Sequence, residues 1–220
     1  ESLKEIDELI EGANMVFIAA GMGGGTGTGA APVVAKLSRQ RDILTVGVVT
    51  TPFFFEGKKR KRVAFEGIQE LSQYTDTLLV IPNDKLLELA PELPLHTAFK
   101  VADEILTNAV KGIAELVTKA GLVNLDFADI RAVMKGGGVA LIGVGESDTE
   151  NRATEAVEKA INNPLLDVDI SGANGALINI VGGEDMTLDE ARKVVETISE
   201  KLDEDARIIW GAQIYKDMEK

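Results

Sequence analysis

The sequence predicts an α/β protein in which a parallel sheet domain is followed by a long central helix and a smaller second α/β domain. Two observations predict this class. Short apolar runs of strand length alternate with segments of helical period, as in parallel βαβ winding. One long segment in the middle of the chain is apolar over so much of its circumference that it is expected to be buried on more than one side. We expect domains over residues 1–94 and 122–220, with the central helix over 95–121 between them.

The elements of the first domain follow one another in a regular order. A first helix carries apolar residues at helical spacing and ends at Gly12. The expected strands are 15–20, 43–50 and 77–81, and the expected helices between them are 30–40 and 58–74. Ligands of such sheets bind beyond the carboxyl ends of the strands, so we expect the loops 21–29 and 50–56 to face a ligand.

The second domain has its own alternation of elements. A short helix begins at Asp126. The expected strands are 139–144, 176–181 and 207–210, and the expected helices are 150–161 and 188–202. The glycine runs 136–138 and 182–183 flank strands without a helix directly after them, so they are predicted to be turns.

The composition argues against several classes of function. A formal net charge of −13 over 220 residues repels phosphodiester backbones, so we expect no nucleic-acid partner. The absence of cysteine excludes disulfides and thiolate metal sites and fits a reducing cytoplasm, and the single histidine, His96, excludes a histidine-based triad. The apolar runs are far shorter than the roughly 20 residues of a membrane helix, so we expect no direct membrane insertion.

The most informative stretch is the glycine loop, residues 21–29, which joins the first strand to the next helix. Its glycines allow positive φ and a close approach to a ligand, and the helix start offers unpaired N–H groups that favour phosphate. The loop does not fit G-x-G-x-x-G, and its nearest lysine, Lys36, lies too far along for a Walker loop. Backbone N–H groups and the hydroxyls of Thr26 and Thr28 would therefore hold the anion. The alternative is a tight turn without a ligand.

The run Gly23-Gly24-Gly25-Thr26-Gly27-Thr28-Gly29 resembles the signature of the tubulin/FtsZ superfamily, and its surroundings resemble the FtsZ family of prokaryotic cell-division GTPases. Further motifs follow in that family's order: Thr51-Pro52-Phe53, Phe55-Glu56-Gly57-Lys58, Ile81-Pro82-Asn83-Asp84-Lys85-Leu86 and Asn124-Leu125-Asp126-Phe127-Ala128-Asp129. The resemblance implies a Rossmann-like GTPase domain that binds GTP or GDP with Mg²⁺. It also implies a cytoplasmic protein that polymerises head to tail with itself at the division site, together with other division-ring proteins.

The resemblance further implies which residues bind the nucleotide. Glu56 would lie near the ribose and Arg60 near the phosphates, while the other residues of the basic run 58–62 would be surface. Phe99 would stack on the base, and Asp103 would accept hydrogen bonds from guanine N1 and N2. From the residues alone, the basic run is a solvated face and Asp103 reaches solvent. The residues that would cradle the phosphates are Gly23, Gly24, Gly25, Thr26, Gly27 and Thr28.

Two interpretations are open for Asp126 and Asp129. As residues alone, they are an N-cap aspartate and a first-turn acid, both favoured at a helix start. Two carboxylates on one exposed rim can also orient a water or a hydrated Mg²⁺ near phosphates. The resemblance implies the second role. Asp126 and Asp129 would activate the attacking water at the nucleotide of the next subunit, and Asn124 would help to position the loop. The two interpretations are compatible, and no residue is assigned as a metal ligand.

Compared with the family pattern, we expect the chain to lack a preceding strand and glycine loop, and a following strand, linker and tail. This departure motivates a second hypothesis from a different class. The chain would be a non-catalytic binding module that caps filaments of the complete protein or copolymerises with them. A dinucleotide-dependent oxidoreductase is excluded, because the sequence has neither G-x-G-x-x-G nor a candidate catalytic cysteine.

Overall fold

The computed structural model describes residues 2–89, 94–119, 123, 125–166, 170–216 and 218. By its internal contacts the chain divides into two compact units. The first unit comprises residues 1–110 and 134–141, and the second comprises 111–133 and 142–220. The division falls within one continuous helix, α5 (Leu95–Thr118), whose first part belongs to the first unit and whose last part belongs to the second.

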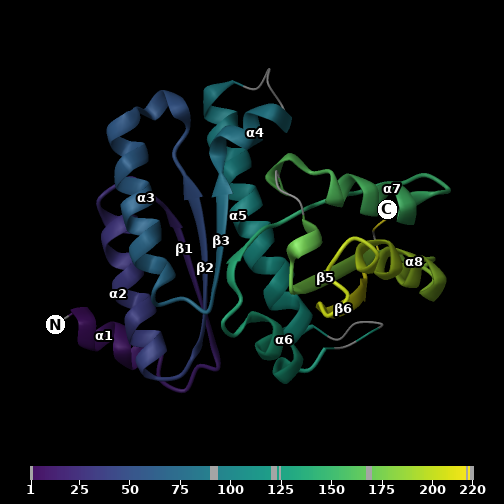
Figure 1. Cartoon of the computed structure of the whole chain (residues 1–220), viewed down its shortest axis with the longest axis horizontal. Helices are drawn as coiled ribbons and strands as arrows, with labels where there is room; N and C mark the ends of the chain where they lie inside the picture. Colours follow the sequence, from purple (N-terminus) through teal and green to yellow (C-terminus); the bar gives the residue numbers. More distant parts are fainter. Residues whose placement is uncertain are drawn as a thin grey trace. The chain divides into compact units, whose positions relative to one another are not determined.

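A parallel sheet forms the centre of the first unit (Figure 1). Its strands are β1 (Met15–Gly21), β2 (Leu44–Thr51), β3 (Thr77–Pro82) and β4 (Gly138–Ala140), in that spatial order. Every neighbouring pair runs parallel. The predicted α/β class with parallel strands is therefore confirmed.

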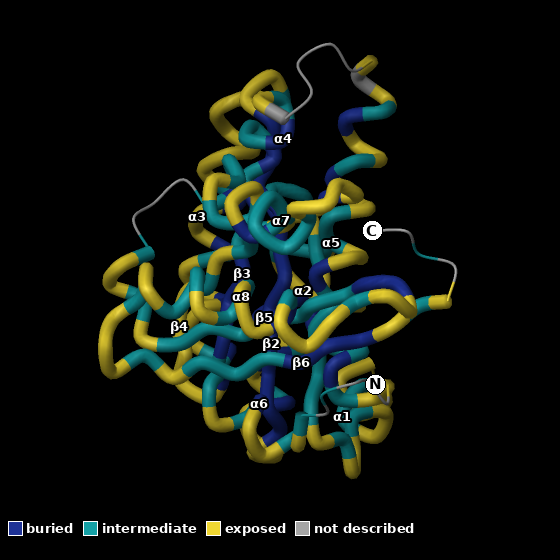
Figure 2. The backbone as a smooth tube through the Cα atoms, turned by 90° about the vertical axis from the view of Figure 1, so that its right-hand side faces the viewer, coloured by how far each residue is buried: buried dark blue, intermediate teal, exposed yellow. Residues whose placement is uncertain are grey.

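Helices α2 (Thr26–Gln40) and α3 (Lys58–Ser72) lie side by side on one face of this sheet (Figure 1). Every residue of β2 is buried, as is typical of a parallel strand covered on both faces (Figure 2). The core between the sheet and the two helices is made of Ile18, Met22, Ala31, Ala35, Val49, Ala64, Leu71 and Leu78. Complete burial of a side chain such as Leu71 contributes about 1.5–3 kcal/mol, so this core holds the glycine loop between β1 and α2 in place.

Three elements of the first unit differ from the sequence prediction. Helix α2 begins at Thr26 rather than at residue 30, because the amide of Gly29 already donates to the carbonyl of Gly25 at 3.0 Å. A helix that the sequence did not predict, α4 (Asn83–Leu89), follows β3 directly. The strand expected over 139–144 is only three residues long and pairs with β3.

The second unit contains a two-stranded parallel sheet, β5 (Gly175–Gly182) and β6 (Arg207–Ile214), paired in register over eight residues. Helices α7 (Arg152–Ile161) and α8 (Leu188–Ser199) pack against each other. Helix α6 (Phe127–Met134) follows α5 along the chain. Short 3₁₀ turns occur at Pro164–Leu166 and Ile170–Gly172 in this unit, and at Phe54–Glu56 in the first unit.

The early end of β4 has a local cause in the second unit. A Cβ atom on Gly143 or Gly145 would collide with the backbone of α7, so this stretch lies directly on that helix. The Asn163 side-chain amide donates to the carbonyl of Val144 at 2.9 Å, and the Lys159 ammonium donates to that of Glu146 at 2.8 Å. Side chains therefore satisfy carbonyls that a longer strand would have paired with a neighbouring strand.

Within the described ranges, none of the helices combines the length and the apolar character needed to cross a membrane.

Candidate functional site

The glycine loop leaves β1 in a conformation that only glycine adopts readily. The amide of Met22 donates to the carbonyl of Thr50 at 2.9 Å, which ties the start of the loop to β2. Gly23 has φ of 101°, in the left-handed region that side chains disfavour. Its amide donates to the hydroxyl oxygen of Thr28 at 2.9 Å. The loop therefore folds back on the first turn of α2, and the hydroxyl proton of Thr28 remains available as a donor.

The first turn of α2 presents backbone amides rather than side chains. Its N-cap residue is Gly25, and among the described residues no side chain caps the helix there. The amides of Thr26, Gly27 and Thr28 precede the first intrahelical bond and so have no partner within α2. A Cβ on Gly27 would lie 2.7 Å from the carbonyl oxygen of Gly21, so only glycine lets this turn approach the strand so closely. The 15-residue α2 thus begins with a group of amides suited to an anion.

Arg60 brings a positive charge to this loop. It lies in the first turn of α3, and a Cβ on Gly23 would meet its backbone oxygen at 2.8 Å and its Cγ at 3.1 Å. Its guanidinium Nη2 would lie 4.0 Å from a Cβ on Gly24. Glu56 pairs with the Arg60 guanidinium at 3.0 Å and is only 13% exposed. The four other residues of the basic run are exposed.

An aromatic cluster connects Glu56 to α5. The amide of Phe53 donates to Glu56 Oε1 at 2.9 Å, and the Phe53 ring is completely buried. Phe55 stacks on Phe53 with ring centroids 5.0 Å apart, and Phe99 meets Phe53 edge-on at 5.1 Å. Phe99 stays 40% exposed, which leaves ring surface open for a further contact. Asp103, one turn later on α5, is exposed.

The structure therefore brings most of the predicted nucleotide residues into one connected group. The glycine loop touches Arg60, Arg60 pairs with Glu56, and Glu56 is linked through Phe53 to Phe99. Asp103 is near this group because it lies one turn after Phe99 on α5.

Two residues with a structural part in the site were not predicted. Gly67, in the middle of α3, faces α2, and a Cβ there would meet Thr28 Cγ2 and Met22 Cε. Asp84 of α4 accepts the amide of Phe54 at 2.7 Å and lies 3.6 Å from the Lys61 ammonium, so it holds the aromatic turn. Gly67 could have been found from the sequence, because an isolated glycine inside a helical pattern often indicates close packing against a neighbouring element. The signal for Asp84 was weaker, because it depends on α4, which the sequence did not predict.

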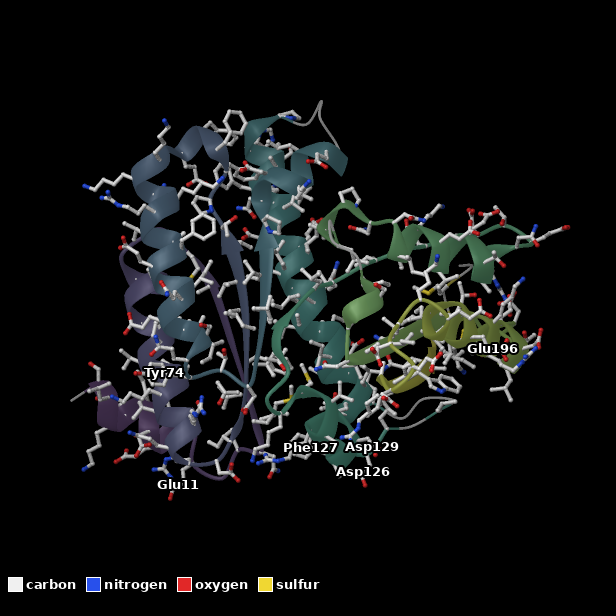
Figure 3. The ribbon with its side chains drawn as sticks, viewed as in Figure 1. Glu11, Tyr74, Asp126, Phe127, Asp129 and Glu196 are labelled. Atoms are coloured by element: carbon white, nitrogen blue, oxygen red, sulfur yellow. The ribbon has the colours of Figure 1, made fainter. Side chains whose placement is uncertain are left out.

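The acidic rim, Asp126 and Asp129, lies at the start of α6 in the second unit (Figure 3). Asp126 Oδ1 accepts the amide of Ala128 at 3.1 Å, and the Asp126 carbonyl accepts the amide of Asp129 at 3.1 Å. Both aspartates are exposed, whereas Ile130 on the inner face of α6 is completely buried. Asp126 therefore does act as a helix cap, and a buried helix face supports both carboxylates. Asn124, the third predicted catalytic residue, lies outside the described residues.

Carboxylates are the side chains of this chain best suited to Mg²⁺. Within the described ranges, no three histidine, aspartate or glutamate side chains gather as a metal site. Mg²⁺ at phosphates usually keeps several waters and takes one or two carboxylates in addition to phosphate oxygens. Among the described residues, the side chains therefore fit an ion carried mainly by nucleotide phosphates better than a preformed site of protein ligands.

Two family models match separate parts of this chain. The family model described as Tubulin/FtsZ family, GTPase domain, matches residues 1–91, and the model described as FtsZ family, C-terminal domain, matches residues 138–220. Cell division protein FtsZ 1 of Methanocaldococcus jannaschii is 61% identical over 219 residues, which is 100% of this chain and 60% of that protein. Its counterpart in Thermococcus kodakarensis is 61% identical over 220 residues, 100% of this chain and 59% of that protein.

A solved structure, an empty FtsZ dimer from M. jannaschii, matches with a TM-score of 0.97 at 60% sequence identity. The match covers 99% of this chain and 64% of that chain. The chain therefore spans about 60% of the length of the curated relatives it matches.

Proposed function

Because the chain belongs to the FtsZ family, we propose that it binds and hydrolyses GTP in cell division and assembles head to tail with further copies of itself. In this proposal each nucleotide is bound by one copy, and the acids that hydrolyse it come from the next. The protein would act at the division site, in contact with other division-ring proteins. The matches do not favour the alternative of a non-catalytic module that caps filaments or copolymerises with them.

One observation carries the nucleotide part of the proposal: uncapped amides at the start of α2 lie beside the Arg60 guanidinium. The amides and the positive end of the helix dipole favour phosphate oxygens, and the guanidinium adds a charge-assisted donor. The Glu56 carboxylate fixes the direction of Arg60 and has acceptor oxygens suited to a ribose hydroxyl. Gly23, Gly24, Gly25, Thr26, Gly27 and Thr28 would together form the cradle.

Recognition of the base would come from α5. The exposed part of the Phe99 ring offers a surface on which a base can stack. Asp103 is exposed one turn further along the helix and accepts hydrogen bonds only. Guanine presents donors at N1 and N2, whereas adenine has no donor at N1, so a carboxylate acceptor favours GTP over ATP.

Hydrolysis would use the acidic rim of the neighbouring copy. A carboxylate of Asp126 or Asp129 accepts a proton from water as the water oxygen bonds to the γ-phosphorus. The bond from the γ-phosphorus to the oxygen that bridges it to the β-phosphorus breaks in the same step, leaving GDP and phosphate. The amides of α2 and the Arg60 guanidinium stabilise the charge on the phosphate oxygens. Asn124 would help to position the rim. Mg²⁺ would neutralise phosphate charge when bound, and no step is assigned to it.

The test compares nucleotide binding with turnover. We expect the protein to bind GTP and GDP in a titration but not ATP. We expect Asp129→Ala to bind GTP as the unchanged protein does and to lose nearly all turnover. The matched control is Asp189→Ala, which removes an exposed first-turn acid from α8 and should keep full turnover. Full turnover by Asp129→Ala, or no binding of GTP by the unchanged protein, would refute the proposal.

A further inference from the structure

Strand β6 contacts the chain on both sides of the acidic rim, and it also contacts the end of α5. These contacts all lie in the second unit, whereas the residues assigned to nucleotide binding belong to the first. The strand is paired along its whole length with β5, so it is a rigid element.

The first contact precedes the rim. The amide of Val123 donates to the carbonyl of Ala212, and the amide of Ala212 donates back to the carbonyl of Val123, both at 3.3 Å. Beside this bridge, a Cβ on Gly211 would lie 2.6 Å from Leu116 Cδ2, 3.4 Å from the Val123 oxygen and 3.6 Å from Leu125 Cδ1. Glycine at 211 therefore lets the strand reach α5 and the residues directly before Asp126.

The second contact follows the rim. The guanidinium of Arg207, at the start of β6, donates to the carbonyl of Ala132 at 2.9 Å. Ala132 lies in the last turn of α6, whose first turn carries Asp129. Strand β6 thus contacts two places: the last turn of α6, at Ala132, and the backbone that precedes α6, at Val123. Because α6 is short, a shift at either place moves both carboxylates.

The third contact fixes the end of α5. The hydroxyl of Tyr215, directly after β6, donates to Glu115 Oε2 at 2.8 Å, and the Lys119 ammonium donates to that hydroxyl at 2.8 Å. Lys119 also pairs with Glu115 at 2.6 Å and lies over the Tyr215 ring at 4.9 Å. The Glu115 side chain is 13% exposed, so this network is partly shielded from water.

We propose that β6 positions the acidic rim for catalysis, with Gly211 and Tyr215 as positioning residues. This inference rests on the proposed role of Asp126 and Asp129 in hydrolysis. Each positioning residue acts by holding the backbone that carries the carboxylates. A misplacement of about 1 Å in a catalytic group can cost on the order of 100-fold in rate, so small shifts of β6 should be visible in turnover.

The first test adds a methyl group at the close contact of Gly211, in the full-length protein. We expect Gly211→Ala to lower kcat by about 10- to 100-fold while the affinity for GTP stays unchanged. Hydrogen exchange at the Val123 and Ala212 amides should become faster, because the added methyl group pushes Val123 away from β6. The control is Gly172→Ala, where a Cβ meets nothing within 4 Å, and it should change neither kcat nor exchange.

The second test removes one hydroxyl and keeps the ring. We expect Tyr215→Phe to lower kcat by about three- to tenfold at unchanged GTP affinity, since the hydroxyl links Glu115 to Lys119. Tyr74→Phe is the control: Tyr74 packs against the core of the first unit, whereas the rim belongs to the second, and the variant should retain full kcat.

Comparison with Asp129→Ala separates this inference from the proposed function. If Asp129→Ala loses turnover while Gly211→Ala and Tyr215→Phe keep full kcat, the positioning role is refuted and the proposed function stands. If Asp129→Ala keeps full turnover, the proposed function itself fails. When Tyr215→Phe is added to Asp129→Ala, we expect a smaller further loss than Tyr215→Phe causes alone, because one of the two positioned carboxylates is already absent. An additional loss of full size would contradict the positioning role.

Discussion

Gly67→Ala tests whether the packing of α3 on α2 shapes the glycine loop. A Cβ at position 67 would meet Thr28 Cγ2 and would lie 2.9 Å from Met22 Cε. Neither neighbour has room to give way easily, because Met22 is 3% exposed and the hydroxyl of Thr28 accepts the Gly23 amide at 2.9 Å. The added methyl group should therefore push Thr28 away from Gly23.

Two opposing effects set the expected change in stability. Alanine in place of glycine inside a helix gains roughly 0.5–1 kcal/mol. Inserting a methyl group into a well-packed contact costs typically about 1–3 kcal/mol. The second effect is the larger over most of these ranges, so we expect the free energy of unfolding to fall by about 0–2.5 kcal/mol. Loss of the Gly23–Thr28 hydrogen bond, worth about 0.5–1.5 kcal/mol, should weaken GTP binding by about three- to tenfold.

The assay is denaturant unfolding together with a GTP titration of the same samples. The matched control is Gly112→Ala in α5, where the nearest atom to a new Cβ is Asn179 Nδ2 at 3.7 Å, an ordinary contact. The control should be more stable by about 0.5–1 kcal/mol and should bind GTP normally. If Gly67→Ala is stabilised as much as the control and binds GTP equally well, the assigned packing role of Gly67 is wrong.

The remaining predictions concern the base, the phosphates and pH. Asp103→Asn should weaken GTP binding by about 10- to 100-fold and reduce the preference for GTP over ATP, as measured by competition; an unchanged preference would favour the view that Asp103 only reaches solvent. Arg60→Met should weaken binding of GTP more than that of GDP, and equal losses would contradict a contact with the terminal phosphate. Hydrogen bonding to the Arg152 guanidinium lowers the pKa of Glu190 to about 2. A carboxyl with a lowered pKa in the folded state stabilises the fold above its unfolded pKa, near 4.5, and this contribution is lost as pH falls towards about 2. Because Glu190 is 26% exposed, we expect about 1 kcal/mol in denaturant unfolding relative to Glu190→Gln at neutral pH. A difference that persists at the lowest pH would contradict the assignment.

The order and type of most elements could be predicted, because the spacing of apolar residues along the sequence matches which residues are buried in the structure. Strands such as β2 are continuous apolar runs, and their burial on both faces is what such runs predict. The start of α2 was placed too late because glycine has a low helix propensity, yet packing against β1 and α3 keeps Thr26 to Gly29 helical. Helix α4 was not predicted, because it begins at Asn83, directly after the last residue of β3, Pro82, and no loop separates the two elements.

The residues of the candidate site were predicted mainly from the resemblance, and their roles stay predictions. Glu56 and Arg60 were assigned by resemblance, and the structure adds their pairing and the contact of Arg60 with the loop. The supporting contacts were not predictable, because they depend on how elements far apart in sequence approach each other. Gly67 against Thr28, and β6 beside the acidic rim, are both of this kind. The roles of Asp103, Asp126 and Asp129 remain predictions that the experiments above test.

In the proposed mechanism, one copy binds GTP and the next copy supplies the acids that hydrolyse it. Steady-state GTP turnover per subunit, measured as the protein is diluted, tests this claim most directly. We predict that turnover per subunit falls towards zero on dilution while GTP remains bound, so the total rate rises more than linearly with protein concentration. Constant turnover per subunit down to concentrations at which only single copies are present would contradict it.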